Sequence, residues 1–367
     1  MRRAVAVLLV AAAVAAPGAV AGAIGPSRLL SHDFGYAVSY RTVGAGDWQI
    51  RLSLYDHGRW SDATPPRLHA NLIDDVAFAD RQHGWIAAYD CARAAVYVYR
   101  TTDGARSWQA LGARGTHSCG GGPTFLSFVD DRRGWMEPVS PNGPAGALLR
   151  TDDGGRTWIP LAAGASPGTP ALPCLAPIEF LSRSVGWMAR CGAAVFRTDD
   201  GGRRWRRVAI RVPPGAPIYD LPRFVGRAGV VASTLGRSTS TEVAFSVSPD
   251  GGRSWAVRSV RRIAACPLRR TFPGEPFWPT AVAGTRVWWI VAGRDETVVQ
   301  VTGDAGRHWR SVVARGLPRR ACAVTSVTAA DMQDAWVVAR YGPGRDTALY
   351  GTGDGGRTWQ RVRLPSG

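Results

Sequence analysis

One eight-residue phrase recurs six times in this chain, and it constrains the fold more than any other feature. The copies approximate the pattern Ser/Thr-x-Asp-x-Gly-x-x-Trp. They occupy residues 101–108 (TTDGARSW), 151–158 (TDDGGRTW), 198–205 (TDDGGRRW), 248–255 (SPDGGRSW), 302–309 (TGDAGRHW) and 352–359 (TGDGGRTW). Self-similarity at a fixed period is typical of a repeat architecture. A motif present in every repeat belongs to the scaffold, so specific chemistry must be sought between the copies.

The spacing of the copies gives the size of one repeat. The tryptophans that close them are separated by 50, 47, 50, 54 and 50 residues. A step of 48 residues back from Trp108 reaches YDHGRW at 55–60, a worn seventh copy that is one residue short. Trp48 fits less well, because its gap to Trp108 would be 60 residues.

A second motif, F-x-D-x-x-x-G-W, precedes each copy. It is clear at 78–85, 128–135 and 180–187, weaker at 329–336, and degenerate at 33–36, near Gly229 and near Trp289. Short apolar runs with β character separate the two motifs, and no sustained helical period is present. A 50-residue unit holds four strands of about six residues, which is the size of one propeller blade. We therefore predict an all-β, seven-bladed β-propeller of four-stranded antiparallel blades, with the repeated hairpins between strands three and four.

Turn chemistry explains the composition of the phrase. An Asp carboxylate in a tight hairpin accepts backbone N–H groups, a Ser/Thr hydroxyl adds a local hydrogen bond, and Gly adopts positive φ angles. The Trp begins the next strand and buries a large ring. We therefore assign a structural role, as turn staples, to Asp103, Asp153, Asp200, Asp250, Asp304 and Asp354.

These motifs carry a family resemblance that covers nearly all of the chain after residue 30. The phrase resembles the Asp-box, or bacterial neuraminidase repeat. Its pairing with F-x-D-x-x-x-G-W about 23 residues upstream resembles the photosystem II stability/assembly factor-like propellers. It is more distantly similar to the propellers of sialidases, xyloglucan hydrolases and sortilin receptors. The resemblance implies a propeller fold and a role in handling another protein, but the fold alone does not determine the activity.

The N-terminal segment predicts export. Arg2 and Arg3 precede an apolar stretch that is too short to span a bilayer, and small residues suited to signal peptidase end at Ala21 or Ala23. We expect a signal peptide at 1–23 and a single seven-bladed propeller domain at 24–367. The alternative is an uncleaved N-terminal anchor. No later apolar run is long enough for an integral membrane segment, so we expect a secreted or extracytoplasmic monomer.

Six cysteines are consistent with an oxidising compartment. Six cysteines allow 15 pairings, and the sequence alone does not choose among them. In a propeller, all six would lie on the face opposite the Asp-box turns. That placement favours Cys91–Cys119, Cys174–Cys191 and Cys266–Cys322. No C-x-x-C pair is present, so a zinc site is not expected.

The formal charge of +17 comes entirely from arginine, because the chain contains no lysine. Part of this excess reflects base composition. A basic exported protein nevertheless attracts acidic proteins and anionic envelope polymers or headgroups. No nucleic-acid-binding module is present, so nucleic acid is not the expected partner.

No catalytic constellation, cofactor motif or metal site emerges. Gly164 to Gly168 fits G-x-S-x-G but lies in a Pro/Gly-rich loop, and Gly351 to Gly356 belongs to an Asp-box. Glycoside hydrolysis needs two carboxylates across the scissile bond. The few glutamates, Glu137, Glu179, Glu242, Glu275 and Glu296, give no clear pair. A glycoside hydrolase of sialidase or xyloglucanase type remains the alternative to a binding protein.

One region is left over once the repeats are assigned. Trp278 lies in a loop that accounts for the 54-residue gap, and arginines flank the nearby cysteines. Arginines beside an exposed aromatic ring suit a carboxylate or phosphate of a partner. The partner-binding candidates are Arg261, Arg262, Arg269, Arg270, Trp278, Arg319 and Arg320. The alternative is a solvated loop in which Trp278 covers the sixth blade.

A second set of arginines occupies one position of all six boxes, namely Arg106, Arg156, Arg203, Arg253, Arg307 and Arg357. We expect these side chains to lie along their own blades near an Asp. Taken together, the sequence predicts an exported, non-enzymatic propeller that acts as a binding or assembly scaffold for a protein or an anionic envelope component.

Overall fold

The structure is a computed structural model of the whole chain. It describes residues 22–43, 48–68, 70–90, 92–116, 124–137, 148–161, 177–190, 194–213, 217–236, 240–264, 280–293, 296–319, 323–341 and 346–365. Within these ranges every regular element is a β-strand. The described part of the chain contains no helix that is long and apolar enough to cross a membrane.

The strands form seven consecutive groups. The first three are β1 (Gly22–Ser31), β2 (Phe34–Thr42), β3 (Trp48–Asp56) and β4 (Arg59–Asp62); β5 (Leu72–Phe78), β6 (Gly84–Asp90), β7 (Ala95–Thr101) and β8 (Gln109–Thr116); and β9 (Phe125–Phe128), β10 (Gly134–Glu137), β11 (Leu149–Thr151) and β12 (Ile159–Pro160). The fourth is β13 (Ile178–Phe180), β14 (Gly186–Arg190), β15 (Ala194–Thr198) and β16 (Arg206–Val208).

The fifth group has an additional short strand. It comprises β17 (Pro217–Tyr219), β18 (Arg223–Val225), β19 (Ala228–Gly236), β20 (Ser240–Ser248) and β21 (Ala256–Ala264). The last two are β22 (Thr280–Ala283), β23 (Val287–Ala292), β24 (Val298–Thr302) and β25 (Arg310–Val313); and β26 (Val324–Ala329), β27 (Ala335–Arg340), β28 (Thr347–Thr352) and β29 (Gln360–Arg361).

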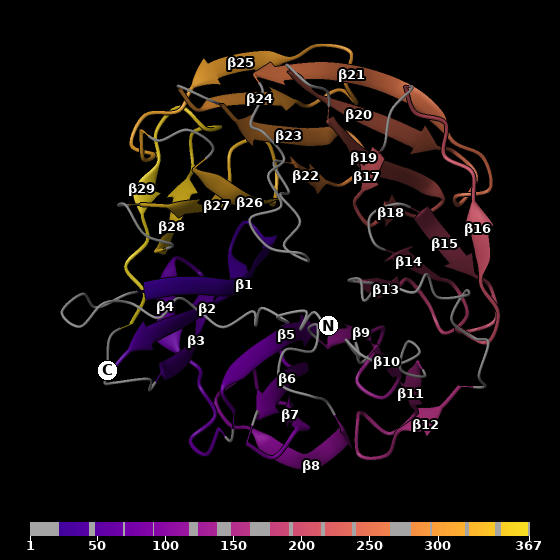
Figure 1. Cartoon of the computed structure of the whole chain (residues 1–367), viewed down its shortest axis with the longest axis vertical. Helices are drawn as coiled ribbons and strands as arrows, with labels where there is room; N and C mark the ends of the chain where they lie inside the picture. Colours follow the sequence, from indigo (N-terminus) through magenta and orange to yellow (C-terminus); the bar gives the residue numbers. More distant parts are fainter. Residues whose placement is uncertain are drawn as a thin grey trace, which may run out of the picture.

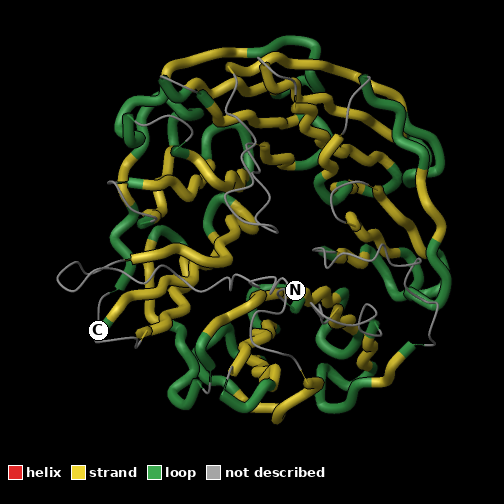
Figure 2. Tube along the Cα trace, viewed as in Figure 1, coloured by secondary structure: helices red, strands yellow, loops and turns green. Residues whose placement is uncertain are grey.

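Each group is one antiparallel sheet whose strands pair in chain order, except that β17 and β18 both pair with β19. Figure 1 and Figure 2 show the seven sheets arranged as blades around a centre, with the first strand of each blade innermost and the fourth on the circumference. Six copies of the phrase join the third strand to the fourth, and the worn copy forms the β3–β4 turn. The predicted seven-bladed propeller is therefore confirmed.

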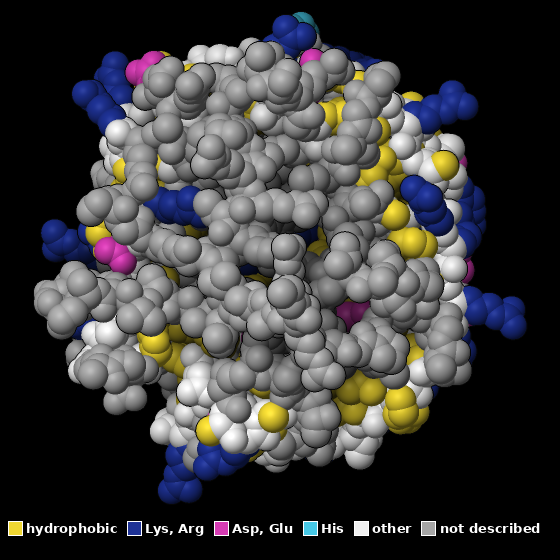
Figure 3. Space-filling view, in the orientation of Figure 1, with side chains coloured by type: hydrophobic (Ala, Val, Ile, Leu, Met, Phe, Trp, Pro, Cys, Tyr) yellow, Lys and Arg dark blue, Asp and Glu magenta, His cyan; other side chains and the backbone are white. Residues whose placement is uncertain are grey.

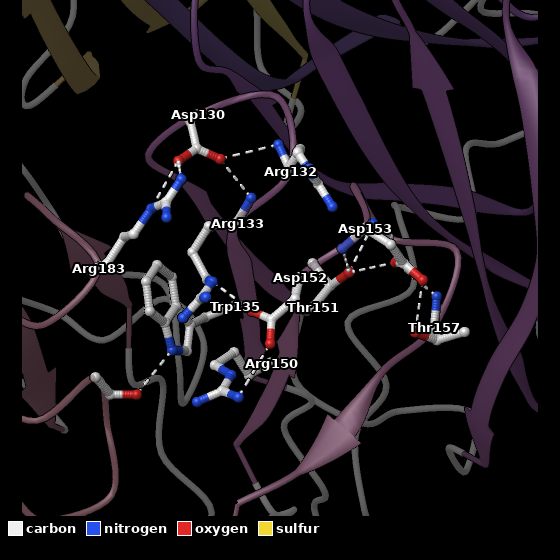
Figure 4. Close-up of polar contacts among 12 residues, drawn as sticks. Asp130, Arg132, Arg133, Trp135, Arg150, Thr151, Asp152, Asp153, Thr157 and Arg183 are labelled. Atoms are coloured by element: carbon white, nitrogen blue, oxygen red, sulfur yellow. Dashed lines mark hydrogen bonds and ion pairs between the residues drawn. The ribbon is translucent and has the colours of Figure 1, made fainter.

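The hairpin of blade 3 shows how the phrase folds (Figure 4). The Thr151 hydroxyl donates to Asp153 Oδ1 at 2.8 Å and accepts the Gly155 N–H at 2.8 Å. Asp153 also accepts the backbone N–H of Thr157 at 2.9 Å and its hydroxyl at 2.6 Å. These bonds outweigh partial burial and lower the pKa of Asp153 to about 2. The carboxylate closes its own turn.

The second motif packs one blade on the next. The Trp135 ring of blade 3 stacks on Phe180 of blade 4, with centroids 3.6 Å apart, and its Nε1 donates to the Gly201 carbonyl at 2.9 Å. Trp85 contacts blade 3 in the same way through Phe128. A Cβ at Gly134 would lie 2.3 Å from Phe128, so the ring can pack there only against glycine. This explains the Phe and Gly-Trp spacing.

The ring closes by packing between blades 1 and 7, and each of these blades is built from its own strands. The Leu29 N–H of β1 donates to Thr328 Oγ1 at 3.1 Å, and the Ile24 N–H donates to Thr347 Oγ1 at 2.7 Å. On the outer side, the ring centroids of Trp336 and Trp60 lie 5.0 Å apart. The two blades are therefore joined by contacts that involve side chains and not by a strand that both of them share.

β1 begins at Gly22, at the edge of the predicted signal peptide. Cleavage after Ala21 would leave this strand whole, whereas cleavage after Ala23 would remove its first two residues. Residues 1–21 lie outside the described residues, so the cleavage position and the 1–23 boundary stay predictions.

Candidate functional site

Charged side chains from three blades meet near the centre of the ring. Glu179 of β13 is ion-paired with Arg223 of β18, and Arg28 of β1 reaches it at 4.0 Å. Burial alone would raise the pKa of Glu179, but the two guanidinium charges outweigh burial and lower it. The Glu179 side chain is only one-quarter exposed. This carboxylate is therefore held ionised and paired.

Two carboxylates of β5, Asp74 and Asp75, accept hydrogen bonds from the backbone of the next blade. Asp74 accepts the Thr124 N–H at 3.0 Å, and Asp75 accepts the Leu126 N–H at 2.8 Å. β5 of blade 2 is therefore bonded to the residue just before β9 of blade 3 and to β9 itself. Burial outweighs these bonds and raises the pKa of Asp74 to about 7 and that of Asp75 to about 6. Both carboxyls serve as links between blades.

The structure describes three of the seven partner-binding candidates. Arg261 of β21 donates through Nε to Gln300 at 2.8 Å and lies over the Trp309 ring, so it joins blade 5 to blade 6. Arg262 is 74% exposed and meets Glu242 at 3.4 Å. Arg269, Arg270, Trp278 and Arg320 lie outside the described residues, as do all six cysteines of the predicted disulfides. The cysteine pairs and the common site formed by these arginines and Trp278 therefore stay predictions.

Arg319 lies in the wall of a hollow of about 790 Å³ beside blade 6. Glu296 and Thr297 form one side of this hollow, and Val313 to Arg319 form the other. Arg315 and Glu296 bring charges of both signs, and Leu317 is buried beneath them. Arg319 is exposed and lines this hollow, and its role in partner binding stays a prediction.

A denser basic surface lies on the outer rim of blades 4 and 5. We call it the basic rim and define it by eight exposed arginines: Arg203, Arg204, Arg206, Arg207, Arg211, Arg253, Arg258 and Arg262. They lie on the hairpin and outer strand of each blade and on the segment that follows β16. The two halves adjoin, because Ser246 of β20 donates to the Arg211 carbonyl at 3.3 Å. Figure 3 shows arginines projecting from this edge, on the right-hand side.

Few carboxylates balance the basic rim. Asp200 and Asp250 are occupied within their own hairpins. Asp199 lies between Arg197 and Arg206, and Glu242 contacts Arg262. Among the described residues, the guanidinium groups of Arg204, Arg207, Arg211 and Arg258 have no hydrogen-bond or ion-pair partner. Unpaired guanidinium groups present several donors each and bind carboxylates and phosphates in forked geometry.

The box arginines behave largely as expected. In four boxes the guanidinium donates to the backbone carbonyl of the box Asp, at 2.9 Å for Arg156, 3.2 Å for Arg203 and Arg253, and 3.0 Å for Arg357. All six box arginines are exposed. They place positive charge on every blade that carries a full box. Blades 4 and 5 differ from the other blades by the further arginines of the basic rim.

No group of three or more potential metal-ligating side chains gathers within the described residues. The motifs around the ring instead connect the protein to a known family. Residues 58–208, which run from the worn box to the outer strand of blade 4, match the family described as photosynthesis system II assembly factor YCF48. Over these residues, which are less than half of the chain, the protein is similar to that family.

Solved structures agree with this fold. The chain is similar to YCF48 from Cyanidioschyzon merolae at 18% identity, covering 83% of this chain and 88% of that one, with a TM-score of 0.51. A YCF48 bound to D1 peptide matches at 21% identity over 81% of this chain and 82% of that one, with a TM-score of 0.49. Comparison with curated proteins gives no match.

A glycoside hydrolase is also similar in fold. The GH74 enzyme of Niastella koreensis matches at 14% identity with a TM-score of 0.60, covering 93% of this chain. This chain spans 54% of that enzyme. At such identity the likeness concerns the propeller itself, so the activity of that enzyme does not transfer.

In the blade 4 half of the basic rim, sequence reasoning named Arg203 only as a box arginine and missed Arg204, Arg206, Arg207 and Arg211. The run RRWRR at 203–207 is plain in the sequence. Because it ends a box and begins the next strand, its arginines were assigned to the scaffold and not to a binding surface. A comparison of the seventh box position could have found them. That position holds Ser, Thr or His in five boxes and Arg204 in the sixth.

Proposed function

We propose that this protein is an exported, non-enzymatic propeller that holds an acidic region of a partner protein against its basic rim. The concentration of exposed arginines on two adjacent blades carries the proposal. Cationic surfaces of this kind steer acidic partners and select against basic ones. The likeness of residues 58–208 to an assembly factor supports a protein as the partner.

Export is part of this proposal. The basic and apolar N-terminus and the six cysteines support it. Signal peptide cleavage near Ala21 would place the propeller outside the cytoplasm, where the partner would be an envelope or secreted protein. An anionic envelope component that binds through the same arginines is the competing outcome of the test.

The experiment compares capture by three forms of the protein. The mature chain, immobilised, is incubated with an envelope extract, and bound proteins are identified by mass spectrometry. A variant carrying Arg204→Thr, Arg207→Gln and Arg211→Gln should lose most of the captured partner. A second variant, with Arg269, Arg270, Arg319 and Arg320 changed to Gln, tests the region around Trp278.

The matched control changes Arg106 and Arg307, which are exposed box arginines on blades 2 and 6. This control should capture the partner like the unchanged protein. Capture that is equal in all variants would overturn the basic rim as the binding surface. Loss of capture after protease treatment of the extract supports a protein partner, and capture that survives protease points to an anionic polymer.

A glycoside hydrolase activity is the alternative function. The GH74 neighbour shows that such a propeller fold can be part of a glycoside hydrolase. Glu179, Asp74 and Asp75, however, are all bonded to neighbouring blades. A screen of the mature protein against soluble glycans tests the alternative, and release of reducing ends would support it.

A further inference from the structure

We propose that the outer edge of β21 accepts an extended acidic segment of the partner as an added β-strand. This inference rests on the proposed function, because it names how part of the basic rim would engage a protein. In this segment of the partner, an aliphatic residue has one acidic residue two positions before it and another two positions after it.

β21 is an unusually long edge strand for this molecule. It has nine residues, whereas the fourth strands β4, β12, β16, β25 and β29 have two to four. Figure 1 places it on the circumference. Among the described strands it pairs only with β20. An edge of this length presents a row of free backbone donors and acceptors that another strand can pair with.

The other long edge, β8, is less suitable. Its pairing with β7 is interrupted by two register shifts, and Gly112 within it has a φ of 86°. β21 pairs with β20 in unbroken register from Ser259 to Ala264, after one shift near its start. A regular ladder is the template that strand addition needs.

The side chains of β21 divide between its two faces. Ser259 and Arg261 contact blade 6, through Trp309 and Gln300, and Ile263 packs in the same cluster. Val260 and Arg262 lie on the opposite face, across from Ala244 and Glu242 of β20. Val260 is 42% exposed and the Arg262 side chain 74% exposed.

Arg258 completes the row at the register shift, and it is also exposed. The row therefore reads Arg, Val, Arg at alternate positions along the edge. Cross-strand neighbours of opposite charge stabilise a sheet, and aliphatic pairs add apolar contact. An added strand with the order acidic, aliphatic, acidic at alternate positions matches this row in either direction.

The charge of the protein argues for one kind of occupant. A second copy would place Arg258 and Arg262 against the same arginines, in a chain whose formal charge is +17. An anionic polysaccharide could meet the arginines, but it has no backbone amides to extend the sheet. An acidic peptide satisfies both the charges and the edge.

The test measures binding of a fluorescein-labelled peptide that contains Glu-Thr-Val-Thr-Glu to the mature protein by fluorescence anisotropy. Arg258→Glu with Arg262→Glu should weaken binding by about tenfold or more, because two attractions become repulsions. Arg106→Glu with Arg307→Glu, which changes the charge equally, should change the affinity by less than about twofold. Equal losses in both variants would overturn a specific site.

The backbone is tested on the unchanged protein, so the result does not depend on how a variant folds. The peptide is prepared with N-methyl amides at alternate positions, in the two possible registers. One register should lose nearly all binding, because its amides face β21 and can no longer donate. If both methylated peptides bind like the parent, strand addition is wrong.

The two proposals fail in different ways. If the Arg204, Arg207 and Arg211 variant loses partner capture but peptide binding does not depend on β21, the proposed function is supported and strand addition is wrong. If the peptide binds as described but envelope capture does not depend on the basic rim, the proposed function falls.

Discussion

The hairpins of blades 3 and 4 differ by one residue, TDDGGRTW against TDDGGRRW. In both, the first Thr donates to the Asp, at 2.8 Å to Asp153 and 2.9 Å to Asp200. In both, the seventh residue gives its backbone N–H to that carboxylate. Thr157 adds a hydroxyl bond of 2.6 Å, which Arg204 cannot make. Arg204 is exposed instead.

This difference separates a hairpin that is optimised for its turn bonds from one that exposes an additional charge. Blade 3 keeps the full set of turn bonds, as do the boxes of blades 2, 5 and 7 with Ser or Thr and of blade 6 with His308. Blade 4 gives up one bond and gains a solvent-facing cation in the middle of the basic rim. Departures from local optimum of this kind are expected where a surface has a role beyond folding.

The largest expected effect comes from Trp135, which joins β10 of blade 3 to the hairpin of blade 4. Trp135→Ala should destabilise the protein by about 3–5 kcal/mol, because it removes a fully buried ring stacked on Phe180 and the bond to Gly201. Urea unfolding followed by tryptophan fluorescence measures the change. Trp85→Ala, the equivalent position one blade earlier, should cost a similar amount. A loss under about 1 kcal/mol would show that this stack does not hold the blades together.

The two box aspartates should differ in the cost of their removal. Asp153→Ala should destabilise by about 2 kcal/mol and Asp200→Ala by about 1 kcal/mol, because Asp153 accepts one more hydrogen bond. Denaturation midpoints of the two variants measure the difference. Equal costs would mean that the hydroxyl of Thr157 contributes nothing.

Exchanging the seventh residues should move stability in opposite directions. Arg204→Thr should stabilise the protein by up to about 1 kcal/mol by restoring the hydroxyl bond, and Thr157→Arg should destabilise it by a similar amount. Thermal unfolding gives both values. The stabilised variant should also bind the partner less well, and retention of full binding would separate Arg204 from the binding surface.

The smallest effect is the pH dependence of a single hairpin. The folded pKa of Asp153 is about 2, below the usual 3.9 of an unfolded Asp. Its contribution is therefore complete above pH 4 and is lost as the pH falls through 2. Melting temperatures of the unchanged protein and of Asp153→Asn, measured from pH 5 to pH 2, should converge as the pH decreases. A constant difference would contradict the lowered pKa.

Much of the architecture was predictable because the motifs act locally. The box closes its own turn within eight residues, so its Asp and Trp mark the third and fourth strands wherever they occur. The worn box at 55–60 was recognisable from spacing, and it forms the β3–β4 turn. Export, the cysteine pairs and the site around Trp278 stay predictions, since they involve residues outside the described ranges.

The basic rim was harder to predict because exposure is a tertiary property. Arg261 and Arg262 are adjacent in sequence, yet one bridges to Gln300 and Trp309 while the other points to solvent. Strand alternation separates their faces, and only the neighbouring blade decides which face is covered. Arg223 and Arg28, which no sequence motif singles out, meet Glu179 because strands from blades 1, 4 and 5 converge there.

The sequence by itself determined the number of blades, the position of each hairpin and the family likeness, because the period and the turn bonds are local. The tertiary structure decided how the ring closes, which carboxylates are paired between blades and which of the described arginines are exposed. Those outcomes depend on contacts between blades some 50 residues apart, and they follow from packing that no single repeat contains.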